Sequence, residues 1–161
     1  MQKIRALLPP GGYANAVGTW LAALDNGLAE LKTRALRFSP EHWTAKVAPT
    51  VRSPAEIAIH AGDVEAKWVH VGIGGRVAPP PPAASAGRDA ILAYVDGVRA
   101  TSAAILKPLV ERDLDTLRVI PGKEGKTTVR RALAELLEHQ AHHRGQLGML
   151  ARLLAPPAVK A

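Results

Sequence analysis

The chain of 161 residues contains no cysteine, which excludes disulfides, thiolate metal ligands and a cysteine nucleophile. Aromatic residues make up only 4% of the sequence, too few to form the stacking platforms that bind single-stranded nucleic acids. No apolar run is long enough to span a bilayer, and the N-terminus has too short an apolar run for a signal peptide. We therefore expect a cytoplasmic protein without a membrane segment, in which any bound metal has nitrogen or oxygen ligands.

Acidic residues are also in deficit. The chain has 21 Lys and Arg against 14 Asp and Glu, which gives a formal net charge of +7 and a pI near 10.1. A basic protein of this kind can bind nucleic acid through phosphate contacts. Its basic residues are scattered along the chain, however, and the only modest cluster lies between Lys123 and Arg131. We interpret the charge as a solvated surface and keep nucleic-acid binding as the less favoured alternative.

Strand patterns are nearly missing. The only short candidate is Leu117 to Ile120, and no other segment is expected to pair with it. Apolar residues instead recur at helical spacing in four segments, at about 13–35, 53–72, 88–107 and 127–154. A proline-rich stretch over about 72–87 forms an extended connector between the second and third segments. This pattern predicts one all-α domain over residues 1–161, a four-helix bundle with a long crossover between helices 2 and 3. An irregular all-α domain is the alternative.

The second helix has a well-defined start. Ser53 is a preferred N-cap residue, Pro54 occupies the first helical position, and Glu56 completes a capping box. The apolar stripe that follows is expected to be buried, and it comprises Ile57, Ala61, Val64, Trp68 and Val71.

The most informative stretch is His139-Gln-Ala-His-His-Arg-Gly-Gln146 in the last helix. His139 and His143 are one helical turn apart and therefore project from the same face. In a heptad register with Val129 at position a, the core positions a, d and e are apolar except in one layer, which contains His139, Gln140, His143 and Gln146. Burying polar groups without partners costs on the order of 1–3 kcal/mol each. We therefore expect a group within the bundle core to satisfy this layer.

A third histidine faces the interior from another helix. In the register of the second helix, His60 occupies the inward position d. Together with His139 and His143 it can supply three nitrogen ligands to one divalent metal ion and leave positions open for water or substrate. The alternative for His60 is a hydrogen-bonded core histidine. His142 falls on the flank of its helix, and we interpret the other two histidines as structural or solvent-facing: His42 and His70.

These motifs resemble those of the DinB/YfiT-like family of proposed metalloenzymes. The resemblance rests on the motif at 139–147, the Ser53-Pro-Ala-Glu-Ile-Ala-Ile-His60 segment and the interval between them, and it spans nearly the whole chain. It implies a bundle of up-down-down-up topology, a homodimer, and a divalent ion (zinc, nickel, manganese or iron) bound by His60, His139 and His143. The activities it implies are a thiol S-transferase with a low-molecular-weight thiol as cosubstrate or a metal-dependent hydrolase, in some relatives within a stress response.

A three-histidine ion can lower the pKa of a bound water or thiol and so produce a nucleophile near neutral pH. Gln146 is a candidate to orient an imidazole or a bound ligand, and Asp63, Glu56 and His142 are further candidates near the site. Gly145 is expected to permit close helix packing. The residue after His139 is not glutamate, so the general base of an H-E-x-x-H protease is missing. A metal-dependent enzyme is the favoured interpretation, and a metal-binding or interaction module without turnover is the alternative.

Overall fold

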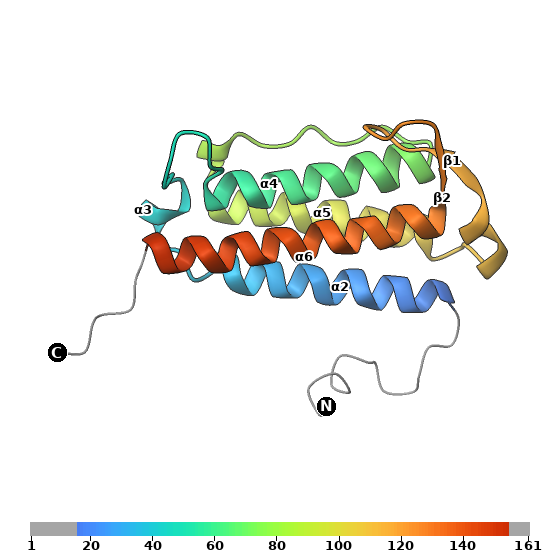
Figure 1. Ribbon diagram of the computed structural model, residues 1–161, viewed down its shortest axis with the longest axis horizontal. Coiled ribbons are helices and arrows are strands. Elements are labelled where there is room, and N and C mark those ends of the chain that lie inside the picture. Colours follow the sequence, from blue (N-terminus) through green and yellow to red (C-terminus); the bar gives the residue numbers. More distant parts are fainter. Residues whose placement is uncertain (1–15, 155–161) are drawn as a thin grey trace, which may run out of the picture.

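The structure is a computed structural model that describes residues 16–154 (Figure 1). Long helices dominate it and lie side by side along one axis (Figure 1). They are α2 (Ala16–Ala35), α4 (Pro54–Glu65) with its continuation η1 (Ala66–Ile73), α5 (Arg88–Leu106) and α6 (Val129–Leu154). Short elements join them, namely α3 (Pro40–Trp43), η2 (Ala84–Ala86), η3 (Glu111–Asp115), β1 (Leu117–Val119) and β2 (Lys126–Thr128). The all-α class is confirmed, while the first residues of the predicted first helix, 13–15, lie outside the described part of the chain.

The predicted start of α4 is confirmed in atomic detail. The backbone N–H of Glu56 donates to Ser53 Oγ over 3.2 Å, and the backbone N–H of Ser53 donates to Glu56 Oε2 over 2.8 Å. This reciprocal capping box satisfies donors that a helix start otherwise leaves unpaired. It fixes the first turn of the helix that carries His60.

The proline-rich connector after Gly74 runs along the length of the bundle (Figure 1). As a result α4 and α5 both begin at the end of the bundle where α3 lies, and the β1–β2 hairpin lies at the other end (Figure 1). Across residues 16–154, no helix is both long enough and apolar enough to cross a membrane.

The segment from Leu117 does find a partner, which corrects the prediction that nothing pairs with it. β1 and β2 pair antiparallel, with Leu117 opposite Thr128 and Val119 opposite Lys126. The turn between them contains two glycines in the left-handed region, Gly122 at φ 80° and Gly125 at φ 67°, which glycine adopts at little steric cost. The partner strand is three polar residues, so its sequence lacks the apolar alternation by which strands are predicted.

The second half of the second helix is π-helical over Ala66–Ile73, and its buried face differs from the predicted one. Val71 is 37% exposed, and neither Val64 nor Trp68 is fully buried. The buried residues recur instead at every fourth position: Ile57, Ala61, Glu65 and Val69, and beside them Ala58, Gly62, Ala66 and His70. Hydrogen bonds from i to i+5 put more than 3.6 residues in each turn, so a four-residue spacing stays on one face.

The predicted polar layer lies between two apolar clusters. One cluster includes Phe38, Trp43 and Leu150, and the other includes Leu24 and Leu136. Between Leu136 and Leu147 on α6, the side chains that enter the core are polar, since Gln140 is 3% and His143 is 2% exposed. The heptad register places Leu153 at the core position d, near the end of this helix. Leu153 is 57% exposed, so this part of the prediction was wrong. A straight helix drifts by about 20° per heptad, which moves the last d position out of the core.

Candidate metal centre

Three imidazoles from two helices converge on one point. His60 comes from α4, and His139 and His143 come from successive turns of α6. His139 Nε2 lies 3.2 Å from His60 Nε2 and 3.0 Å from His143 Nε2. One ligand atom from each ring lies within 4.8 Å of the others. The structure therefore brings together the three histidines that the sequence singled out.

The two separations from His139 Nε2 fit ligands of one shared cation. Nitrogen ligands about 2.0–2.1 Å from an ion, at octahedral to tetrahedral angles, lie about 2.9–3.4 Å apart. A neutral imidazole carries one proton, so His139 Nε2 can donate to only one of its two neighbours. A cation would accept the lone pairs of all three nitrogens at once.

Gln146 holds one of the rings in the orientation that a ligand needs. His143 Nδ1 donates to Gln146 Oε1 over 2.7 Å, which leaves the lone pair of the neutral ring on Nε2, facing the other histidines. The amide Nε2 of Gln146 in turn donates to His142 Nε2 over 2.9 Å. His142 is exposed on the flank of α6, as predicted, and contacts the site only through Gln146 and the edge of the His143 ring.

The surroundings keep the imidazoles uncharged. Burial lowers the pKa of His139 and that of His143 to about 4. Burial and the positive charge of Arg52 lower the pKa of His60 below its ordinary value. The neutral ring is the form that binds a metal ion, so all three side chains are ready for coordination at neutral pH. The Nδ1 atom of His139 is buried without a partner among the described residues.

The carboxylates that the sequence placed near the site bind elsewhere. Asp63 pairs with Lys67 on its own helix at 2.7 Å, and Glu56 binds Lys46 at 2.8 Å in addition to its capping role. Neither hydrogen-bonds a histidine of the site. The prediction for Gly145 was wrong, because this glycine faces open space. The close approach of α2 and α6 occurs at Gly27, where a Cβ would overlap Gln140 Oε1.

A buried charged network lies next to the histidines, and sequence reasoning missed it. Arg99 Nη1 donates to Glu65 Oε1 over 3.1 Å, and Arg99 Nε donates to Asp25 Oδ1 over 2.7 Å. Gln140 Nε2 donates to the other Glu65 oxygen over 3.2 Å. Gln140 therefore belongs to this network, although its position in the polar layer had suggested a place in the site. Glu65 lies outside the apolar stripe predicted for the second helix, so that pattern did not indicate its burial.

Trp68 lies beside His139, and two histidines outside the cluster, His70 and His42, have other contacts. The Trp68 ring lies 6.2 Å from the His139 ring, and Lys123 Nζ lies 4.5 Å above the Trp68 ring. His70 is 1% exposed, and its Nε2 lies 3.0 Å from the carbonyl oxygen of Val98. It is structural, in keeping with the prediction, but lies inside the π-helical segment. His42 lies in the short helix α3.

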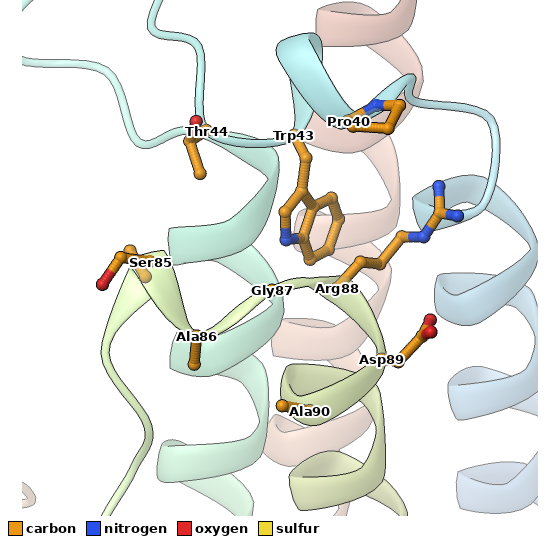
Figure 2. Close-up of a pocket in the computed structure, with 10 residues that line it drawn as sticks. Pro40, Trp43, Thr44, Ser85, Ala86, Gly87, Arg88, Asp89 and Ala90 are labelled. Carbon is orange, nitrogen blue, oxygen red and sulfur yellow. The ribbon is translucent and has the colours of Figure 1, made fainter.

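The three histidines do not line the larger of two cavities in the structure. A cavity of about 530 Å³ is lined by residues of α3, η2 and the start of α5, including Trp43, Gly87 and Arg88, and it contains none of the three histidines (Figure 2). A second cavity, of about 230 Å³, includes Gln146 among its lining residues and so adjoins the histidines.

The fold and the site define a helical protein with a three-histidine cluster between two of its helices. A family model described as the DinB superfamily matches residues 23–147, and the chain belongs to this superfamily, as the sequence motifs indicated. No curated protein matches the sequence significantly.

Solved structures share the fold. A conserved protein from Enterococcus faecalis superposes with a TM-score of 0.75 at 13% identity, over 90% of this chain and 100% of that one. A DinB-like protein, YjoA, from Bacillus subtilis gives 0.68 at 21% identity, over 89% of this chain and 96% of that one. A DinB-like protein from Bacillus cereus gives 0.64 at 20% identity, over 92% and 99% of the two chains. At these identities the likeness establishes the fold alone.

Proposed function

We propose that His60, His139 and His143 bind one divalent metal ion and that the protein is a metal-dependent enzyme that activates a thiol or a water molecule. The observation that carries the proposal is the convergence of three neutral Nε2 atoms at separations of 3.0 and 3.2 Å. Imidazole nitrogen suits zinc, nickel and iron, and manganese is a further candidate in this superfamily. The resident ion is therefore to be determined by measurement.

When bound, such an ion lowers the pKa of a coordinated thiol or water and so supplies a nucleophile near neutral pH. The residues of the chain position the ligands. Gln146 fixes the His143 ring, and Trp68 packs beside His139. The apolar clusters above and below the layer lower the local polarity, which strengthens electrostatic interactions at the site.

Two reactions fit this arrangement, a thiol S-transferase with a low-molecular-weight thiol as cosubstrate and a hydrolase that uses water alone. Asp63 is the acidic side chain whose charge is felt at His60, and it becomes a candidate for proton transfer if its pair with Lys67 opens.

The proposal extends to the topology of the helices, the oligomeric state and the location of the protein. We propose a single domain in which the long helices follow the up-down-down-up order, supported by the connector that runs the length of the bundle. We also propose a homodimer in the cytoplasm, supported by exposed apolar side chains such as Val110, which is 49% exposed. Light scattering coupled to size-exclusion chromatography tests the dimer.

The first experiment is elemental analysis of protein purified without a histidine tag. We expect close to one divalent ion per chain, and a rise in melting temperature when metal is added to stripped protein, because a ligand that binds only the folded state stabilises it. His143→Ala should abolish the rise, whereas His42→Ala, outside the site, should retain it. Stripped protein that shows no shift with zinc, nickel, manganese or iron contradicts the proposal.

The second experiment asks for turnover. Metal-loaded protein is mixed with low-molecular-weight thiols and the electrophile monochlorobimane, and in parallel with ester substrates. Conjugation that needs both thiol and metal identifies the transferase, and ester cleavage without thiol identifies the hydrolase.

A metal-binding module without turnover is the second candidate function. It is favoured by one observation, that Asp63 and Glu56 are already paired with Lys67 and Lys46. Metal binding without conjugation or cleavage in any of these assays supports this candidate over the enzyme.

A further inference from the structure

The 230 Å³ cavity lies between the start of α4 and the end of α6. Its walls are mainly apolar and include Val51, Ile57 and Leu150, and its polar lining groups include Arg52 and Gln146. Pockets for drug-sized ligands usually occupy about 300–1,000 Å³, so this one suits a smaller molecule.

The cavity lies next to the histidine site along both helices, although none of the three histidines lines it. Ile57 is three residues before His60 on α4, and Gln146 is three residues after His143 on α6, so each lies one turn from a ligand on the same face. The hydrogen bond of 2.7 Å between Gln146 and His143 joins the cavity wall directly to the site. A small molecule in the cavity therefore contacts the side chain that orients one of the three imidazoles.

Arg52 gives this cavity its charge. It is exposed and forms no ion pair or hydrogen bond with the residues between 16 and 154. The nearest carboxylate in sequence, Glu56, is bound by Ser53 and Lys46. Arg52 lines the same cavity as Gln146, the side chain that hydrogen-bonds His143, so the guanidinium and the histidine site border one space.

We propose that this cavity binds a small organic monoanion, with its carboxylate on the guanidinium of Arg52, its apolar body against Ile57 and Leu150, and its other end at the histidine site. The inference rests on the proposed metal site, for which it names the substrate class. A guanidinium presents a planar pair of donors that matches a carboxylate. A phosphate dianion would need more donors than one arginine and one amide supply, and the apolar walls favour a carbon body over a hydrated ion.

The probes for this proposal are benzoate and its neutral isostere benzamide. Their binding to metal-loaded and metal-stripped protein is measured by calorimetry. We expect benzoate to bind at least about tenfold more tightly than benzamide at low salt, with the preference shrinking as salt screens the Arg52 charge. Arg52→Ala should remove this preference and leave benzamide binding unchanged, and Arg52→Lys should retain part of it.

Arg118→Ala is the matched control. It removes the same charge from β1, at the end of the bundle remote from the start of α4 (Figure 1), and should leave the affinity for benzoate unchanged. Equal melting temperatures of the variants establish that each one folds.

The outcomes separate the two proposals. If metal binds but Arg52→Ala leaves benzoate binding unchanged, the anion is held by the ion alone, and this inference is overturned while the metal site stands. Benzoate that binds no better than benzamide overturns it as well. If no metal binds, the proposed function fails. Benzoate that still depends on Arg52 in that case reports an anion pocket unconnected to catalysis, which overturns the assignment of a substrate class.

Discussion

Replacing Gln146 by leucine tests whether the hydrogen bond behind His143 supports metal binding. In the native chain His143 Nδ1 donates to Gln146 Oε1 over 2.7 Å, at the short end of the range for N–H···O bonds. The bond holds the ring in the tautomer that presents Nε2 to the ion. Without it, the ring can rotate or carry its proton on Nε2, and both changes oppose coordination.

Loss of the hydrogen-bond partner of a metal ligand lowers metal affinity by about 10- to 100-fold, and we expect a loss of this size here. At about 1.4 kcal/mol per factor of ten, this corresponds to roughly 1.4–2.8 kcal/mol. We expect Gln146→Leu to raise the Kd for zinc by that factor in a chelator competition assay. Gln146→Glu keeps an acceptor and adds a negative charge, so it should bind zinc at least as tightly as the native chain.

His142→Ala is the control, because His142 is exposed and bonds only to the far side of the same amide. It should change the Kd by less than about threefold, within the small energies expected of an exposed contact. The reasoning is refuted if Gln146→Leu binds zinc with native affinity, or if His142→Ala weakens binding as much as Gln146→Leu does.

Three further predictions concern stability, and urea unfolding of metal-free protein measures all of them. Ser53→Ala removes the cap of α4 and should cost about 1 kcal/mol, and a change within error would contradict the role of the capping box. Arg99→Met leaves Glu65, which is 3% exposed, without its cation and should cost about 3–5 kcal/mol, whereas adding Glu65→Met should recover much of the loss. The pKa values of His139 and His143 are lowered to about 4 in the folded chain, so the unfolded chain takes up protons first as the pH falls. The stability these neutral rings contribute is present above about pH 6.5 and is lost as the pH falls towards 4, and a His139→Ala/His143→Ala chain should show a shallower decline.

Much of the fold was predictable because its signals are local. The start of α4 follows from Ser53, Pro54 and Glu56, which act within a single turn. The end of α5 follows from the proline after Lys107. The grouping of His60, His139 and His143 was predictable for a related reason, since three polar residues interrupt otherwise apolar helix faces.

The remainder depends on contacts between distant segments. The pairing of Glu65 with Arg99 joins residues 34 apart, and a single sequence does not indicate which buried charges meet. The meeting of Arg52 and Gln146 at one cavity depends on where the loop before α4 lies against the end of α6. The buried face after Glu65 was mispredicted because the period of 3.6 residues does not hold in the π-helical segment.

The π-helical segment also bears on how this chain can change in length. Its i to i+5 bonds already accommodate extra residues in the helix, so the deletion of one residue within Ala66–Ile73 could be absorbed by a return to α-helical bonding. Such a deletion would leave His60 in place, because His60 precedes the segment. A change in length at the hairpin end of this helix is therefore separated from the turn that carries His60.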